Sequence, residues 1–182
     1  AHIAQGLHPP SFTAENAAVF NDDQLSRFSV VVLNSASGDF LTPGQQAAFA
    51  RFVARGGGVV ALHAAGDNSH KAPWYVETII GTTFTGHPNG EDHIQPARVD
   101  IVQPRHPIMA GIRTPWIPRD EWYSFDSNPA TRGMAILAQV DEASYRPGET
   151  LRMGAAHPVM WINPRSKGRV FYSALGHEPQ LY

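Results

Sequence analysis

The first third of the chain holds two apolar runs that lack the polar alternation of a half-exposed strand. They are Ser-Val-Val-Val-Leu at 29–33 and Val-Val-Ala-Leu at 59–62, both rich in β-branched residues. Between them, Thr42 followed by Pro43 and Gln45 is typical of a helix N-terminus, and three later glycines predict its end. Strands buried in a parallel sheet have this pattern, and a strand–helix–strand unit is almost always right-handed and parallel. We therefore predict such a unit here.

The rest of the chain predicts shorter elements. A helix is expected at 74–80, and further strands at 99–102, 135–140, 159–162 and 170–175. The long stretch at 81–128 is rich in Pro, Gly and aromatic residues and has little helical periodicity, so we expect loops around a site. Together these elements predict an α/β fold around a mostly parallel sheet.

Composition narrows the class of protein. The chain has 182 residues, 42% of them hydrophobic, which fits a single domain over residues 1–182. Its net charge of -2 offers no basic surface for nucleic acid or for a membrane, and neither partner is expected. The absence of cysteine excludes disulfides, a thiolate zinc site and a cysteine nucleophile. The same absence is compatible with a soluble protein of either the cytoplasm or the periplasm.

A histidine follows each of two predicted buried strands. His63 comes after 59–62, and His177, followed by Glu178, comes after 170–175. Ligands of parallel sheets bind beyond the carboxyl ends of the strands. We therefore expect His63 and His177 to open into one site, with Asn34 in a polar loop that lines it.

Several motifs carry a resemblance to a known family. They are GGGVVALHAA (56–65), GHP (86–88), RHPIMAG (105–111), DEWY (120–123), HPVMW (157–161), GRVFY (168–172) and LGH (175–177). In order and number they resemble the motifs of the ThuA-like (trehalose utilisation) family, from about residue 20 onward. The resemblance implies a flavodoxin-like three-layer sandwich around a mostly parallel sheet, similar to class I glutamine amidotransferases. It also implies a role in the metabolism of disaccharides such as trehalose and of their keto derivatives.

The chain departs from the family pattern at both ends. Residues 1–28 are polar and broken by proline where the family has an apolar first strand, and the chain stops at Tyr182 where the family has a closing helix. We therefore expect a single ThuA-like domain that lacks its first strand and last helix, or whose terminal pieces are disordered. A missing first strand leaves an open sheet edge, and a homodimer or another partner is expected to cover it.

Compared with an amidotransferase, the resemblance places His63 where the nucleophilic cysteine lies and His177-Glu178 where the catalytic histidine and its nearby glutamate lie. Glutamine hydrolysis on this scaffold relies on a thiolate, so we do not expect glutaminase activity. Histidine at this position instead supplies a metal ligand or a proton carrier near neutral pH.

Two adjacent carboxylates are the candidate acid–base pair. Asp120 and Glu121 precede Trp122 and Tyr123, and a carboxylate beside aromatic surface is desolvated, which predicts a raised pKa. Successive residues of an extended segment face opposite ways, so only one should enter the site, and we prefer Glu121 for its reach. The alternative is a loop ion pair with Arg119.

Histidines within the motifs are also candidate metal ligands. Three imidazoles and a carboxylate would hold a catalytic divalent ion such as zinc, and the candidates are His63, His87, His157 and His177 with Glu121. The alternative is that they only form hydrogen bonds with loops and sugar hydroxyls. His106 is interpreted as part of a turn, and four histidines outside the motifs are predicted to lie on the surface: His2, His8, His70 and His93. No nucleotide cofactor is expected.

Two classes of function follow. One is a hydrolase, lyase or isomerase for a disaccharide or keto-sugar, with His63, Glu121 and His177 as the catalytic set. Its substrate contacts are predicted at Asn34, Trp74, His87, Asp120, Tyr123 and His157, where Trp74 and Tyr123 offer aromatic surface to a sugar ring. Phe84 and Trp161 are predicted to belong to the core. The other class is a non-catalytic carbohydrate-binding or regulatory domain without the nucleophilic cysteine.

Overall fold

A computed structural model describes residues 17–67 and 71–181, and its principal element is a six-stranded sheet. The strands of this sheet, in spatial order, are β1 (Val30–Asn34), β2 (Gly58–Leu62), β10 (Val170–Ser173), β9 (His157–Asn163), β8 (Ala135–Val140) and β5 (Val99–Ile101). Two small two-stranded sheets lie outside it: β3 (Phe84–Gly86) pairs with β7 (Ser124–Phe125), and β4 (Gln95–Pro96) pairs with β6 (Arg119–Asp120).

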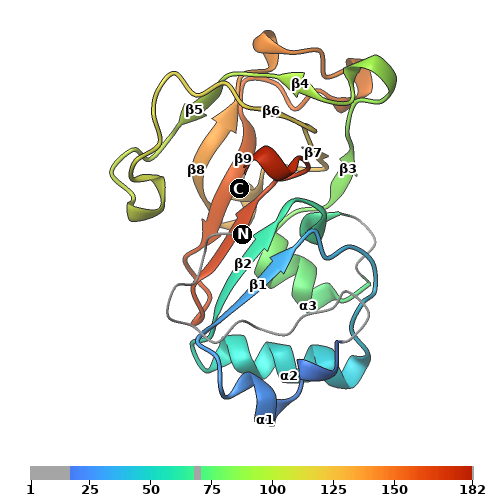
Figure 1. Ribbon diagram of the computed structural model, residues 1–182, viewed down its shortest axis with the longest axis vertical. Coiled ribbons are helices and arrows are strands. Elements are labelled where there is room, and N and C mark those ends of the chain that lie inside the picture. Colours follow the sequence, from blue (N-terminus) through green and yellow to red (C-terminus); the bar gives the residue numbers. More distant parts are fainter. Residues whose placement is uncertain (1–16, 68–70, 182) are drawn as a thin grey trace.

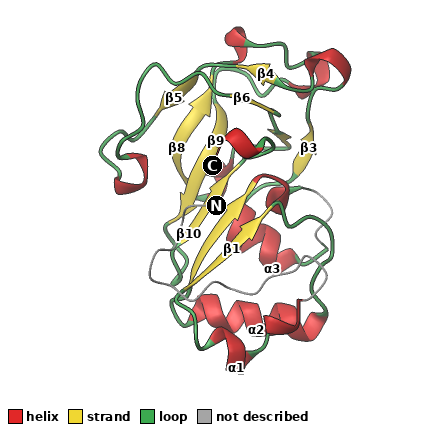
Figure 2. Cartoon of the chain, in the orientation of Figure 1, coloured by secondary structure: helices red, strands yellow, loops and turns green. Residues whose placement is uncertain are grey.

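The α-helices are few and are gathered at one end of the molecule (Figure 1). The α-helices are α1 (Asp22–Leu25), α2 (Pro43–Ala54) and α3 (Pro73–Tyr75), and α3 continues into a π-helical turn, η3 (Val76–Ile80). The short 3₁₀ turns are Ala17–Val19, His63–Gly66, Gly90–Asp92, Pro107–Met109, Pro129–Arg132, Glu142–Ser144, Glu149–Leu151 and Pro179–Leu181. Figure 2 shows that the other end consists mainly of loops and short strands, as expected for a segment without helical periodicity.

The predicted strand–helix–strand unit is confirmed. Thr42 caps α2, because its side chain accepts a hydrogen bond from Gln45 N, and the Gln45 side chain returns one to Thr42 N (2.8 Å). Beyond the helix, Gly56 adopts a left-handed conformation (φ 101°), which glycine tolerates without steric cost. Strand β1 then pairs with β2 in parallel, with Val31 opposite Val59. The elements at 74–80, 99–102, 135–140, 159–162 and 170–175 are also present, with boundaries shifted by at most two residues.

The expected flavodoxin-like three-layer sandwich around a mostly parallel sheet is not confirmed. Only the β1–β2 and β2–β10 pairs are parallel, whereas β10–β9, β9–β8 and β8–β5 are antiparallel. The reason is chain length, because six residues join β9 to β10, and a parallel crossover needs a dozen or more. Within the described ranges, α2 is the one helix of 12 residues or more, so long crossovers are rare. The sheet is therefore mixed and mostly antiparallel.

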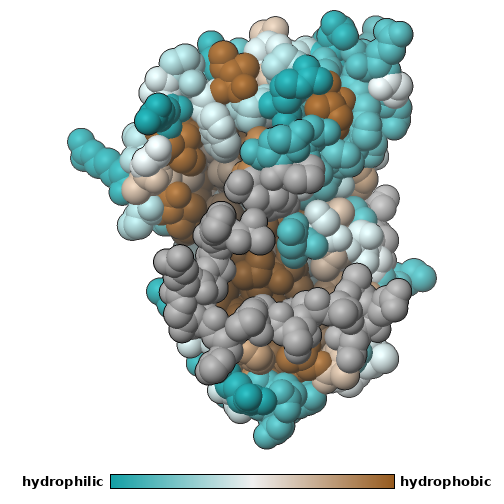
Figure 3. All heavy atoms as spheres, in the orientation of Figure 1, coloured by the Kyte–Doolittle hydropathy of each residue, from teal (hydrophilic) through white to brown (hydrophobic). Residues whose placement is uncertain are grey.

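The open face of β1 is a second departure from a three-layer sandwich. Val31 and Leu33 are buried, but Val30 and Val32 on the other face are 44% and 51% exposed. Figure 3 shows apolar residues at the surface in the middle of this view, between a more polar lower and upper end. Helical cover in the described part of the chain is thus incomplete over β1.

The ends of β2 and β10 are where the fold positions its candidate site. Both strands run in the same direction, so Leu62 and Ser173 lie opposite each other and their next residues meet at one edge (Figure 1). The short strands β4 and β6 bring the loop that contains residues 90–95 next to Asp120, through the Gln95–Asp120 pair. Beneath this edge, the core includes the fully buried rings of Trp161 and Tyr172.

Candidate active site

His63 occupies a strained turn directly after β2. It is the first residue of a 3₁₀ turn and has φ 49°, the left-handed region that non-glycine residues rarely adopt. The turn is also tight, because a Cβ added at Gly66 would lie 2.3 Å from the Tyr172 hydroxyl oxygen. Strained residues of this kind concentrate at functional sites.

The imidazole of His63 is buried and held in one orientation. Its side chain is 4% exposed, and its ring centroid lies 4.3 Å from that of Tyr123. Nδ1 donates to the carbonyl oxygen of Ala174 (2.9 Å), which leaves Nε2 facing the site. Nε2 lies 3.0 Å from Glu121 Oε2 and 3.2 Å from His177 Nδ1. The expected proximity of His63 and His177 is therefore confirmed, and their role in a site stays a prediction.

Glu121 is the centre of the histidine cluster. Its side chain is 5% exposed, and Oε2 faces His63 and His177, the latter at 3.6 Å from Nδ1. Oε1 faces two other imidazoles, because it contacts His93 Nε2 and lies 3.4 Å from His87 Nδ1. We call these five residues the histidine–glutamate cluster. Within the cluster, Glu121 and His63 are buried, whereas the other three imidazoles are 27–39% exposed.

The pKa of Glu121 is lowered rather than raised. Burial by itself raises the pKa, as predicted, but hydrogen bonds from His63 and His93 and the charges of His87 and His63 outweigh burial. The resulting pKa of about 2 keeps Glu121 ionised at neutral pH. Burial and the negative charge of Glu121 also raise the pKa of the neighbouring Tyr123 hydroxyl well above its usual range. Glu121 therefore acts as a permanent anion among imidazoles.

Asp120 contacts a different part of the His177 segment from Glu121, because it binds the backbone and not the imidazole. It is fully buried and accepts hydrogen bonds from the backbone N–H groups of Gly176 (2.7 Å) and His177 (3.1 Å). Burial raises its pKa, opposed by these hydrogen bonds. Because it binds the backbone that carries His177, Asp120 is a positioning residue. The predicted substrate contact at Asp120 has no support in this arrangement.

Sequence patterns missed His93. It is predicted only to lie on the surface; its side chain is 39% exposed, but its Nε2 also contacts Glu121 Oε1 and its ring lies 5.1 Å from that of His177. Strands β4 and β6, which bring it there, are only two residues long and leave no periodic pattern. His93 lies two residues before Gln95, and Gln95 pairs with Asp120 of the DEWY motif; this pairing is what brings His93 to the cluster. His2, His8 and His70 lie outside the described residues.

Three predicted substrate contacts have different environments. His87 and Tyr123 belong to the site, with their rings stacked at 5.8 Å. Asn34 ends β1 opposite Leu62 and is exposed, so it lies at the same sheet edge, one strand away. Phe84, predicted to belong to the core, is partly exposed and its ring lies 4.3 Å from that of Tyr123. Trp161 is fully buried, as predicted.

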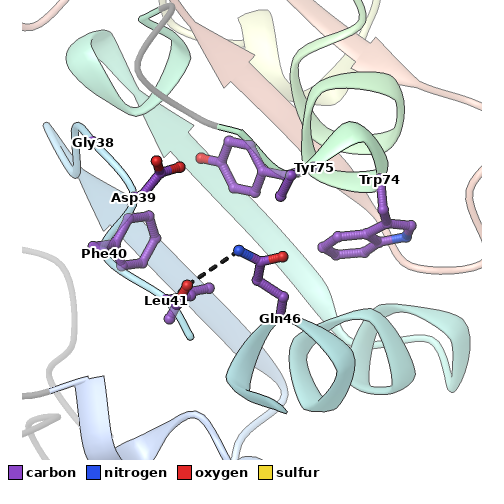
Figure 4. A pocket seen from close by; sticks show the side chains of 8 residues that line it. Gly38, Asp39, Phe40, Leu41, Gln46, Trp74 and Tyr75 are labelled. Carbon is purple, nitrogen blue, oxygen red and sulfur yellow. Dashed lines mark hydrogen bonds between the residues drawn. The ribbon is translucent and has the colours of Figure 1, made fainter. Parts of the chain in front are cut away.

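Trp74 lies away from the cluster. Its ring packs against Phe49 of α2, with centroids 5.6 Å apart. Figure 4 shows it at a separate shallow hollow, which is also lined by Gly38, Asp39, Phe40, Leu41, Gln46, Ala72 and Tyr75. The role predicted for Trp74 as a sugar contact is therefore not retained.

His157 is structural in this fold. Its side chain is fully buried at the start of β9, and its Nδ1 lies 2.9 Å from Glu142 Oε1. Its Nε2 donates to the carbonyl oxygen of Tyr123 (2.8 Å). Both ring nitrogens are engaged beneath the site, so His157 is not retained as a metal ligand or a substrate contact. His106, interpreted as a turn residue, accepts a hydrogen bond from Ile108 N at the start of a 3₁₀ turn.

Comparison with known proteins identifies the family. A profile of the ThuA family, described as trehalose utilisation, matches residues 4–182. The chain belongs to the ThuA family. This membership supports a carbohydrate-related role at the level of the family. No curated protein matches the chain.

Solved structures similar to this ThuA chain agree on the fold. A ThuA-like protein from Bacteroides uniformis has a TM-score of 0.74 at 22% identity, over 91% of this chain and 66% of its own. One from Parabacteroides merdae has a TM-score of 0.62 at 22% identity, over 84% and 61%. This chain thus spans about two thirds of the length of these relatives or less. A β-galactosidase from Bacillus circulans sp. alkalophilus shares the fold over 86% of this chain but only 21% of its own (TM-score 0.56, 18% identity).

Proposed function

We propose that this ThuA-family chain is an enzyme that acts on a disaccharide carrying a keto group. The observation that supports the proposal is the histidine–glutamate cluster, in which one buried anion contacts four imidazoles at the ends of two parallel strands. Strand ends are where α/β proteins bind small molecules, and the family description supplies the sugar class of substrate.

The two oxygens of Glu121 suggest a division of roles. On the Oε1 side, the imidazole of His93 is 39% exposed and acts as the base that takes a proton from the carbon next to the keto group. On the Oε2 side, the partly exposed His177 faces the carbonyl oxygen, whose negative charge rises as that proton leaves, and the buried His63 lies 3.2 Å from the Nδ1 atom of His177. The ionised Glu121 balances the positive charge that His93 acquires. The electron pair of the broken C–H bond moves into the carbonyl group.

Aromatic surface next to the cluster supports a sugar substrate. The rings of Phe84, Tyr123 and His63 follow one another with centroid separations of 4.3 Å; Tyr123 and His63 are buried, and the partly exposed Phe84 offers the ring surface. A flat apolar surface beside polar groups is the usual surface against which a sugar ring stacks. The same surface favours the second candidate function, a carbohydrate-binding domain without catalysis.

The first prediction tests the proposed role of His93. His93→Gln should lower kcat on keto-trehalose by about 10²–10⁴-fold with a small change in KM, because glutamine cannot accept the proton. His106→Gln, which changes a histidine outside the cluster, should turn over at the wild-type rate. Turnover and calorimetric binding are measured together on variants with wild-type circular dichroism.

Either of two outcomes would contradict this function. Wild-type turnover in a folded His93→Gln variant would exclude His93 as the base. Binding of the disaccharide by the wild-type chain without any turnover would instead support the carbohydrate-binding domain.

A further inference from the structure

We infer that His63, Glu121 and His177 together bind one divalent transition-metal ion, with zinc as the first candidate. The inference deepens the proposed function and rests on it for the role of the ion at the carbonyl oxygen. Binding itself is measured independently of activity.

The first argument is the spacing of the three donor atoms. His63 Nε2, Glu121 Oε2 and His177 Nδ1 form a triangle with edges of 3.0, 3.2 and 3.6 Å. Ligands at zinc bond lengths of about 2.0–2.1 Å lie about 3.3 Å apart in a tetrahedron. A triangle with these edges has a circumscribed radius of about 1.9 Å, so one point just off its plane lies at zinc bonding distance from all three atoms.

The second argument is the hydrogen bonding of His63. Because Nδ1 donates to the Ala174 carbonyl oxygen, Nε2 is the ring nitrogen that faces the carboxylate of Glu121, and it can present either a proton to that carboxylate or a lone pair to an ion. Two acceptors 3.0 Å apart repel each other unless a proton or a cation lies between them. A metal-binding histidine commonly donates its other ring N–H to a backbone carbonyl, and His63 has this arrangement.

The third argument is the difference in solvent exposure among the three ligands. His63 and Glu121 are about 5% exposed, whereas the His177 side chain is 37% exposed. Two nitrogens and one carboxylate oxygen are a common catalytic zinc set, and they leave a further coordination position for water or substrate. The partly exposed His177 side places that position toward solvent. An ion there would polarise the keto oxygen, while His93 on the other oxygen of Glu121 keeps its proton-transfer role.

The second triplet of nearby donors is a weaker candidate. His87 and His93 also approach Glu121, through its other oxygen. His87 Nδ1 lies 2.9 Å from the carbonyl oxygen of its neighbour Pro88, so this nitrogen already has a partner. We therefore assign the ion to the His63 side.

The second prediction is metal binding by chelator-stripped protein at pH 7.5. Zinc chloride and manganese chloride are titrated by calorimetry, and bound metal is counted after dialysis. We expect one zinc per chain in the wild-type protein. Glu121→Gln and His177→Ala should each weaken zinc binding by at least 10-fold, because each removes one of three ligands. His106→Ala, a matched loss of one imidazole outside the cluster, should bind as the wild type does.

Several outcomes would overturn the inference. One is the absence of zinc binding by folded wild-type protein, and another is unchanged affinity in both cluster variants. Because Glu121 is buried and its variant can fail to fold, His177→Ala on the partly exposed loop is decisive by itself. Keto-trehalose turnover that survives complete stripping contradicts the role of the ion at the keto oxygen but leaves the proposed function. Zinc binding without turnover supports the ion and contradicts the proposed function.

Discussion

His63 shows at the scale of one residue how a site is built at a cost in stability. Its backbone adopts φ 49°, which costs an L-residue about 1–2 kcal/mol. In return, the turn directs Nε2 toward Glu121 and His177 rather than into the sheet. The buried ring also binds Ala174 and packs on Tyr123, so His63 contributes to stability as well as to the site.

The third prediction concerns this strained backbone. His63→Ala should lower the free energy of unfolding by about 2–3 kcal/mol, because it removes a buried ring and its hydrogen bond. His63→Gly should be more stable than His63→Ala by about 1 kcal/mol, because glycine adopts φ 49° without strain. Urea unfolding of the two variants measures the difference. An alanine variant as stable as the glycine variant would show that the turn is relaxed.

At the scale of elements, the side chain of Asp126 links the segment before β3 to the segment after β7. Its Oδ1 accepts hydrogen bonds from Thr82 Oγ1 (2.9 Å), Thr83 N (3.2 Å) and Ser127 Oγ (2.8 Å), next to the pairing of β3 with β7. Burial raises its pKa, but these hydrogen bonds and the charge of Arg132 outweigh burial and lower it. Asp126 thus holds the segment that carries Phe84 beside the cluster.

The fourth prediction is a pH dependence at Asp126. A carboxylate whose pKa is lower in the folded state contributes stability above its unfolded pKa, near 3.9, and loses it as the pH falls through the folded pKa. Asp126→Asn should cost about 1 kcal/mol at pH 7, a modest value because the side chain is 39% exposed. The difference from wild type should shrink between pH 4 and pH 2.5 in urea unfolding experiments. A difference that is constant over this range would contradict the assignment.

At the scale of the whole molecule, a buried polar network connects the antiparallel half of the sheet to the site. Glu142, just after β8, accepts hydrogen bonds from the backbone N–H groups of Met153 and Gly154. The same oxygen contacts His157, which in turn donates to Tyr123. The backbone beneath the cluster therefore depends on a residue that takes no part in its chemistry.

The fifth prediction tests this network. Glu142→Ala should lower the free energy of unfolding by about 3 kcal/mol, because two N–H groups and an imidazole lose their shared acceptor. Glu149→Ala, at an exposed position on a nearby turn, should change it by no more than about 0.5 kcal/mol. Thermal and urea unfolding report both values. Equal stabilities of the two variants would show that the network contributes little.

In the described ranges, no helix combines the length and the apolar character that crossing a membrane requires. The homodimer that is expected to cover an open sheet edge stays a prediction.

Local interactions explain what the sequence by itself determined. Short segments encode the cap formed by Thr42 and Gln45 and the apolar strands on either side of the helix. The proximity of His63 and His177 follows because the carboxyl ends of neighbouring parallel strands lie at the same edge of a sheet.

Tertiary structure alone decided the rest. The antiparallel half of the sheet depends on which strands pair across distant segments. His93 reached Glu121 through strands of two residues, too short for any periodicity. The low pKa of Glu121 depends on how many imidazoles surround a buried carboxylate, which no local pattern contains. Electrostatics and pairing between distant segments are properties of the folded arrangement, whereas caps, strand pattern and alternation are encoded within a few consecutive residues.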